Sequence, residues 1–171
     1  MLTDLVQIKR YGEKNREENG RFRAWLRRHN FVERRFKAIA QEVEDQIDCT
    51  SCANCCRVAT TQVTDRDIDH LCRFLGLKFH EFVRDYTVET SEEGRILKRT
   101  ENGCIFLDGN LCSVYEARPQ TCQHFPHLVK GAGSLVSRMW HMADRAVYCP
   151  IVFNSLELFK RETSFQPGPK A

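Results

Sequence analysis

The stretch Cys49-Thr50-Ser51-Cys52-Ala53-Asn54-Cys55-Cys56 places four cysteines within eight residues. Cysteine is ordinarily a scarce residue that is buried singly, so this density indicates chemistry that only thiols provide. Two explanations are open, a disulfide framework and a metal site. Cysteines this close together cannot form a common disulfide without strain, but they can turn their sulfurs toward one ion or cluster. The stretch therefore favours metal binding.

Length and composition are those of an ordinary small domain. The chain has 171 residues, of which 42% are apolar and 29% charged, and this suits one domain with a hydrophobic core. The formal net charge of +3 is too small to indicate a nucleic-acid partner by itself. No apolar run approaches the ~20 residues of a membrane span, and Lys9 and Arg10 interrupt the start before a signal peptide can form. We therefore expect a cytoplasmic protein with no membrane partner.

The compartment bears on the use of the nine cysteines. Because the cytosol keeps thiols reduced, a dense cysteine set there indicates metal binding or catalysis more than disulfides. Nine is odd, and Cys72 falls on the apolar face of a predicted helix, so we expect it to be a buried bystander. The eight other cysteines are the candidate metal ligands: Cys49, Cys52, Cys55, Cys56, Cys104, Cys112, Cys122 and Cys149.

Residues 13–47, before the cysteine stretch, are predicted to form one long amphipathic helix. Apolar residues recur there at three- and four-residue steps, at Phe22, Trp25, Leu26, Val32, Phe36, Ile39, Val43 and Ile47. We expect this stripe to lie across the cysteine domain or to pair with a second copy. Arginines between positions 21 and 35 make the helix basic. Without an aromatic platform or a known motif, a solvated face is favoured over nucleic-acid contact.

Two shorter helices and a set of strands are predicted after the cysteine stretch. Thr64 is a helix N-cap before residues 65–75, which end at Gly76, and a second helix follows at 79–86. Turn signals around residues 89–112 indicate short strands, with Cys104 and Cys112 on the two arms of one small hairpin.

Cys122 lies in a loop that prolines make rigid. Pro119 and Pro126 flank it, and a rigid loop favours a preformed site. Arg118 would either donate hydrogen bonds to sulfur or form a structural salt bridge. His124 is either a ligand, a donor to a ligand, or a structural residue.

The same three readings apply to His127. Residues 134–148 form a strand or a helix that leads to Cys149-Pro150, and a final short helix covers 155–162.

Several separated motifs together resemble one known family. They are Cys49-x2-Cys52-x2-Cys55-Cys56, Gly103-Cys104-Ile105-Phe106-Leu107, Cys112-Ser113-Val114-Tyr115-Glu116-Ala117-Arg118-Pro119, Cys122 with Phe125-Pro126, and Cys149-Pro150. Over residues 49–150 the chain resembles the CxxCxxCC cysteine-cluster family, the YkgJ-type zinc- or iron-chelating domain. It departs from the pattern at Gln123, where relatives often carry arginine, and the long helix precedes the shared region. The resemblance implies metal chelation, with an iron–sulfur cluster in some relatives, and no established reaction.

The residues leave the metal open between zinc and iron. Three cysteines at two-residue gaps with a remote Cys-Pro resemble the bacterial ferredoxin pattern, whereas four thiolates also suit zinc. We expect the adjacent side chains of Cys55 and Cys56 to diverge, so that they serve different sites or one of them binds no metal. The resulting partition puts Cys49, Cys52, Cys55 and Cys149 on one centre, and Cys56, Cys104, Cys112 and Cys122 on the other.

The sequence as a whole predicts an α+β fold, a small metal-stapled, cysteine-rich domain with short hairpins and helices. We expect an N-terminal helical extension at 1–47, the metal-binding domain at 48–163 and a disordered tail at 164–171. Three functions are open. The first is chelation of zinc or iron, the second is an oxidoreductase or electron carrier that uses an iron–sulfur centre such as a [4Fe-4S] cluster and acts with a partner enzyme, and the third is a zinc-stapled nucleic-acid-binding module. No phosphate loop, nucleophile elbow or Cys-His-Asn order indicates an enzyme. Because metal binding contributes roughly 10 kcal/mol, the metal-free protein should be partly unfolded.

Overall fold

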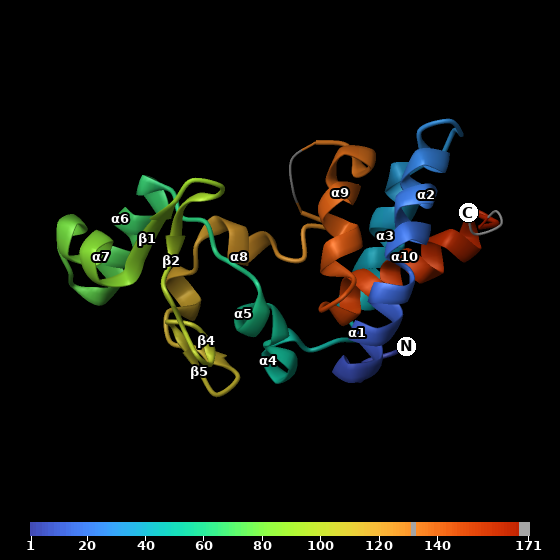
Figure 1. Cartoon of the computed structure of the whole chain (residues 1–171). Coiled ribbons are helices and arrows are strands. Elements are labelled where there is room, and N and C mark those ends of the chain that lie inside the picture. Colours follow the sequence, from blue (N-terminus) through green and yellow to red (C-terminus); the bar gives the residue numbers. More distant parts are fainter. Residues whose placement is uncertain (131–132, 168–171) are drawn as a thin grey trace. The chain divides into compact units, whose positions relative to one another are not determined.

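The computed structural model describes residues 1–130 and 133–167, which form two compact units (Figure 1). The first, the helical unit, comprises residues 1–48 together with the chain from Pro126 onward. The second, the cysteine unit, runs from Cys49 to Phe125 and contains short helices and strands. The chain is therefore α+β, as predicted. Within the described residues, no helix is long and apolar enough to cross a membrane.

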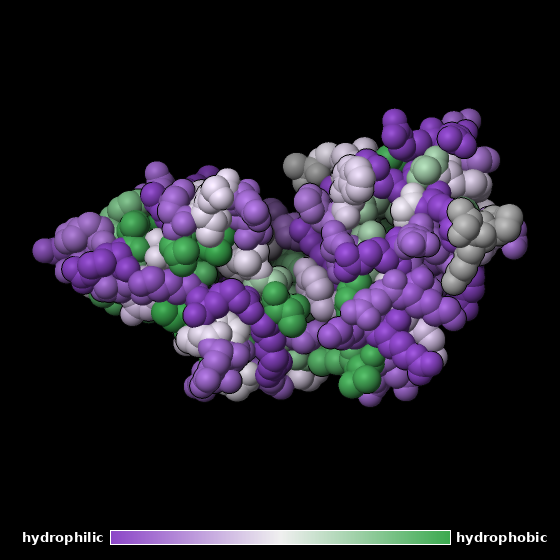
Figure 2. Space-filling model, viewed as in Figure 1, coloured by the Kyte–Doolittle hydropathy of each residue, from purple (hydrophilic) through white to green (hydrophobic). Residues whose placement is uncertain are grey.

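The helical unit is built around its last helix. Its helices are α1 (Leu5–Lys14), α2 (Arg16–Leu26), α3 (Glu33–Glu44), α9 (Leu135–Arg145) and α10 (Pro150–Glu162). Helix α10 packs on α1, α3 and α9, and α2 packs on α9. The Phe159 ring of α10 lies 5.8 Å from the ring of Phe22 and 5.1 Å from that of Phe36, between centroids. The visible face over α2 and α10 is mostly hydrophilic (Figure 2), which is consistent with apolar residues gathered inside.

The prediction of one continuous helix over 13–47 is wrong. The chain leaves helical geometry at Asn15, whose side-chain amide donates to Glu157 Oε1 at 3.1 Å. It is again non-helical between Leu26 and Glu33. A straight helix could not place Phe22 and Phe36 against the same ring of α10, so the apolar stripe is divided between two helices.

The end of the chain is more helical than its sequence indicated. Residues 134–148 were predicted to be a strand or a helix, and the structure has a helix there, α9, at Leu135–Arg145. Helix α10 begins at Pro150, five residues before the predicted start at 155. Pro150 occupies its first turn, where a missing N–H is harmless. Of the predicted tail 164–171, residues 168–171 lie outside the described residues, and Phe165 packs on Phe22 with centroids 4.9 Å apart.

The cysteine unit is made of short elements. Its helices are α4 (Cys49–Cys52), α5 (Asn54–Val58), α6 (Asp65–Leu75), α7 (Phe79–Tyr86), the 3-10 turn η1 (Tyr115–Ala117) and α8 (Gln120–His124). Its strands are β1 (Thr87–Thr90), β2 (Gly94–Leu97), β3 (Arg99–Thr100), β4 (Gly103–Cys104), β5 (Leu107–Asp108) and β6 (Leu111–Cys112). The strands pair antiparallel as β1–β2, β3–β4 and β5–β6.

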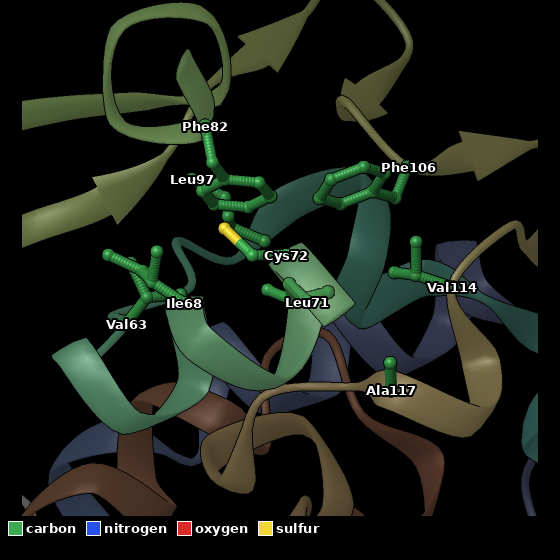
Figure 3. Packing of buried hydrophobic residues seen from close by; sticks show 9 residues of the cluster. All are labelled: Val63, Ile68, Leu71, Cys72, Phe82, Leu97, Phe106, Val114 and Ala117. Atoms are coloured by element: carbon green, nitrogen blue, oxygen red, sulfur yellow. The ribbon is translucent and has the colours of Figure 1, made fainter. Parts of the chain in front are cut away.

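Helices α6 and α7 have the predicted bounds. Thr64 caps α6 with Asp67 in a reciprocal capping box, and Gly76 ends the helix with a left-handed φ of 70°. The apolar face of α6 packs with Phe82 and Phe106 in the core of this unit (Figure 3). Cys72 is 7% exposed within that core, which confirms its prediction as a buried small side chain.

The predicted single hairpin between Cys104 and Cys112 is wrong. Cys104 of β4 pairs with Arg99 of β3, whereas Cys112 of β6 pairs with Leu107 of β5. The Glu101-Asn102 turn closes the first pair and the Gly109-Asn110 turn closes the second. The two cysteines therefore lie on separate hairpins.

Candidate metal centre

A break in the backbone arranges the cysteine stretch. Helix α4 ends at Cys52, Ala53 adopts a left-handed φ of 47°, and α5 starts anew at Asn54. Left-handed geometry disfavours a residue with a Cβ by about 1–2 kcal/mol. The break ends one helix before Cys55 and Cys56 and lets the next turn take its own direction.

Cys55 and Cys56 do not diverge as the sequence predicted. Their sulfur atoms lie 4.0 Å apart in a thiol hydrogen bond. Adjacent residues of a helix are separated by about 100° rather than the 180° of a strand, so rotamer choice can bring both sulfurs together. The geometry therefore gives no reason to assign Cys55 and Cys56 to different sites.

Gly103 brings the first hairpin against α5. A Cβ on this residue would lie 2.6 Å from Cys56 O and 2.8 Å from Arg57 Cα. Its φ of +124° is also one that residues with side chains rarely adopt. Glycine at this position lets β4 approach α5 and places Cys104 next to it. In the sequence, Asn102-Gly103 indicates only a turn, and the glycine directly before Cys104 is the one signal of this closer role.

Cys122 is positioned by contacts from two distant parts of the unit. The Thr61 hydroxyl and Cys122 Sγ are 3.8 Å apart. At the start of α8, Gln120 N–H donates to Asp67 Oδ1 at 2.9 Å, so α6 and α8 are joined at their N-terminal ends. The Asp67 carboxylate therefore serves both helices.

Four thiols are close enough to influence one another electrostatically. Burial, together with the charges of Cys104, Cys56 and Cys112, raises the pKa of Cys122 to about 12 against the opposing effect of the hydrogen bond with Thr61. Burial also raises the pKa of Cys104 and of Cys112, and each feels the charge of Cys56. The structure thus brings these four predicted ligands together from α5, β4, β6 and α8.

Cys56 differs from the other three thiols. The hydrogen bond from Cys55, together with the positive charges of nearby arginines, lowers the pKa of Cys56 to about 6 against the opposing effect of burial. The arginines are Arg57, Arg118 and Arg99. A thiolate is the form of cysteine that binds metal, so Cys56 is the member of the group best prepared to bind first.

Two of these arginines hold the framework of the centre. Arg57 donates to Cys52 O at 2.9 Å and to Gly109 O at 2.9 Å, which ties α4 to the turn between β5 and β6. Arg99 donates to the carbonyl oxygens of Arg57 and Ala59 at the end of α5. Neither arginine was singled out from the sequence, because a long-range side-chain-to-backbone contact leaves no periodic signal.

Arg118 is held in a different way. Its guanidinium lies 3.5 Å from the centroid of the Tyr115 ring. Its Nε is buried and has no hydrogen-bond partner among the described residues.

The remaining predicted residues are more dispersed. Cys49 is exposed, Cys52 is half-buried, and Cys149 is buried at the N-terminus of α10 in the helical unit. His124 ends α8, and the His127 carbonyl accepts a 2.7 Å hydrogen bond from Arg138 in the helical unit.

The four thiols have the right chemistry for a metal but not yet its geometry. Thiolates are ligands of structural zinc and of iron–sulfur clusters. In the part of the chain that the structure describes, however, no three His, Cys, Asp or Glu side chains are placed to hold a metal ion. Coordination therefore requires the sulfurs to move closer together.

Comparison with known proteins identifies the same region. Residues 48–150 match the model of the CxxCxxCC family, which is described as a "Putative zinc- or iron-chelating domain". Two proteins of Methanocaldococcus jannaschii are similar over 99 residues: uncharacterized protein MJ0661, at 29% identity, and uncharacterized protein MJ0939, at 32%. These alignments cover 55% and 53% of this chain, but only 53% and 30% of the relatives. No solved structure matches.

Proposed function

Because the chain belongs to the CxxCxxCC family, we propose that its cysteine unit chelates a zinc or iron ion through Cys56, Cys104, Cys112 and Cys122. One observation carries the proposal: every pair among these four thiols interacts electrostatically, although they come from four separate elements. A fold that only needed to fill space would not bring four half-buried thiols together, since their thiolates repel one another. A metal ion bound by all four thiolates offsets this repulsion with its positive charge.

The surroundings supply what such a centre requires. Four thiolates with a divalent ion leave two negative charges, and the positive charges of Arg57, Arg99 and Arg118 act on the same thiols. A bound zinc ion would hold each sulfur at a metal–sulfur distance of about 2.3 Å. It would thereby link the two hairpins to α5 and α8. The centre would thereby stabilise the unit, and its role is structural or one of metal or redox handling.

The other four cysteines stay a sequence-based prediction. Cys49, Cys52 and Cys55 lie in the cysteine unit, whereas Cys149 lies in the helical unit. Besides binding metal, Cys55 could support the Cys56 thiolate, because its thiol hydrogen-bonds to Cys56. Single replacements of these cysteines would show whether a second ion is bound.

Anaerobic purification tests the identity of the metal. The protein should contain zinc or iron, and an absorption spectrum with sulfide analysis separates single ions from clusters. Matched iron and acid-labile sulfide would establish a cluster and favour electron transfer. A colourless protein with zinc would make the centre structural. Protein purified and reconstituted without either metal would contradict the proposal.

Serine variants test the ligands. Cys56→Ser, Cys104→Ser, Cys112→Ser and Cys122→Ser should each lose metal from the same site. Cys72→Ala is the matched control, because Cys72 is buried in the apolar core and should leave the metal content unchanged. Full metal retention in all four serine variants would contradict the assignment.

A further inference from the structure

Arg118 carries a buried hydrogen-bond donor that the described residues do not use. Its Nε is buried without an acceptor, whereas its backbone is well fixed: Arg118 O accepts from Gln123 Nε2 at 2.6 Å. A buried donor without an acceptor is unfavourable, so in a native structure it calls for an explanation, such as a bound ion or a role in chemistry. An acceptor for the Arg118 Nε–H is therefore expected from a group that binds near this side chain.

The guanidinium is held in place by an aromatic ring. It lies 3.5 Å from the Tyr115 centroid, a distance typical of a close cation–π stack. Tyr115 and Arg118 belong to one tight turn, since Arg118 N–H donates to Tyr115 O at 3.4 Å. Stacking fixes the plane of the guanidinium and hence the direction of its N–H bonds. The donor is thus preorganised.

Its neighbours include the thiols of the proposed centre. The positive charge of Arg118 acts on Cys56 and on Cys112, which precedes Tyr115 by three residues. The two other arginines that act on Cys56 donate to backbone carbonyls, Arg57 to Cys52 O and Arg99 to Ala59 O. Arg118 alone among these three has a buried Nε with no acceptor in the described part of the chain.

We propose that Arg118 is a positioning residue of the metal centre, and that its Nε–H donates a hydrogen bond to a metal-bound thiolate of Cys112 or Cys56. This inference rests on the proposed chelating function. Coordination moves the sulfurs inward and leaves them negatively charged, which makes them good acceptors for a cationic donor. The hydrogen bond withdraws charge from sulfur and fixes the orientation of the ligand. Lysine cannot replace it, because lysine has neither the planar guanidinium nor an Nε–H at that depth.

Cobalt(II) is a suitable probe because thiolate-to-cobalt charge-transfer bands report directly on the sulfur. The full chain is titrated anaerobically with Co²⁺, and affinity is measured by competition with a chelator. Arg118→Lys should bind Co²⁺ roughly 10–100-fold more weakly, which is the usual effect of losing a partner of a metal ligand. Its charge-transfer bands should move to lower energy, because a thiolate without the hydrogen bond gives up its electron more easily.

Tyr115 offers a second, milder perturbation of the same donor. Tyr115→Leu removes the ring that holds the guanidinium and should cause a smaller shift in the same direction. Tyr115→Phe keeps the ring and should leave the bands in place. Arg84→Lys makes the same substitution at an exposed arginine that pairs with Asp85 on α7, so it is the matched control and should leave the bands and the affinity unchanged.

The outcomes separate this inference from the chelation proposal. Wild-type protein without thiolate-to-cobalt bands would overturn chelation and this inference with it. Wild-type bands that stay unchanged in position and affinity in Arg118→Lys would overturn the role of Arg118 alone. If Arg118→Lys does not fold, Tyr115→Leu decides: bands identical to those of Tyr115→Phe would overturn the role.

Discussion

The helical unit and the cysteine unit differ in how their chain segments are buried. Nine of the thirteen residues of α10 are buried, and Phe22, Phe36 and Phe159 are each at most 1% exposed. In the ten residues from Cys49 to Val58, only Ala53 is buried. Burial of apolar surface is the main stabilising contribution to folding, so the helical unit can hold itself together while the cysteine stretch cannot.

Other contacts stand in for the missing core around the cysteine stretch. Arg57, Arg99 and Asn110 join α4, α5 and the hairpins through hydrogen bonds to backbone carbonyls. Such hydrogen bonds contribute about 0.5–1.5 kcal/mol each, and somewhat more when charged. They orient the segments but leave them weakly held. A bound metal would supply the stabilisation that apolar packing supplies in the helical unit.

Metal removal should produce the largest effect, and it should unfold part of the cysteine unit while the helical unit stays folded. Structural metal binding is worth roughly 10 kcal/mol, so a strong chelator should unfold the segments around residues 49–58 and 99–122. Helices α3 and α10 should keep their structure. Hydrogen exchange measured peptide by peptide checks both expectations in one experiment. Equal loss of protection in both units, or loss in neither, would contradict the division.

Phe159→Ala perturbs the core of the helical unit instead of the cysteine unit. It removes a ring that packs against three other phenylalanine rings and should destabilise the helical unit by about 3–5 kcal/mol. The metal content should not change, because the proposed ligands lie in the cysteine unit. Denaturant unfolding and elemental analysis of the same samples test this pair of expectations. Loss of metal together with loss of helix would show that the two units depend on each other.

Gly103→Ala should weaken the cysteine unit specifically. The new methyl would lie 2.6 Å from Cys56 O, and the φ of +124° adds strain, so we expect a loss of about 2–4 kcal/mol and weaker metal binding. Gly20→Ala is the matched control in α2, where no atom lies within 4 Å of the added Cβ. That change should stabilise by about 0.5–1 kcal/mol. Chemical unfolding monitored by circular dichroism compares the two, and equal effects would remove Gly103 from its positioning role.

The same difference explains what could be predicted from the sequence. Helices α6 and α7 have local signals, a capping box at Thr64 and apolar residues at helical spacing, and their bounds were predicted correctly. The long helix was predicted wrongly because periodicity continues across Asn15 and across residues 27–32. Only tertiary packing on α10 shows that the chain must turn there.

At the centre, residue types were easier to predict than geometry. The cysteine spacing indicated a metal site and the family, and the structure gathers Cys56, Cys104, Cys112 and Cys122. The closeness of Cys55 to Cys56 was missed because it depends on rotamers and on the left-handed Ala53. The contact between Gly103 and α5 was also missed, since it joins segments more than forty residues apart.

The smallest predicted effect concerns Asp67, which joins the well-packed part of the cysteine unit to the segment carrying Cys122. Asp67→Ala removes the acceptor for Thr64 N–H and for Gln120 N–H, at 2.9 Å each. We expect a loss of about 1 kcal/mol at neutral pH, as for other helix caps. Asp69→Ala, on the exposed side of the same helix, is the control and should have little effect. Comparable losses from both variants would contradict a special role for Asp67.

The pH dependence of this contact has a definite sign. Burial opposes ionisation of Asp67, but hydrogen bonds from Thr64 and Gln120 prevail and lower its pKa from the ordinary value. A lowered folded pKa means that the stabilisation is complete above the unfolded pKa of about 3.9 and is lost as the pH falls through the folded value. A carboxyl NMR titration should therefore find Asp67 titrating below the ordinary value of an aspartate. If Asp67 titrates at or above the ordinary value, the carboxylate does not hold α8 in place, and Cys122 must be positioned by Thr61 and the flanking prolines instead.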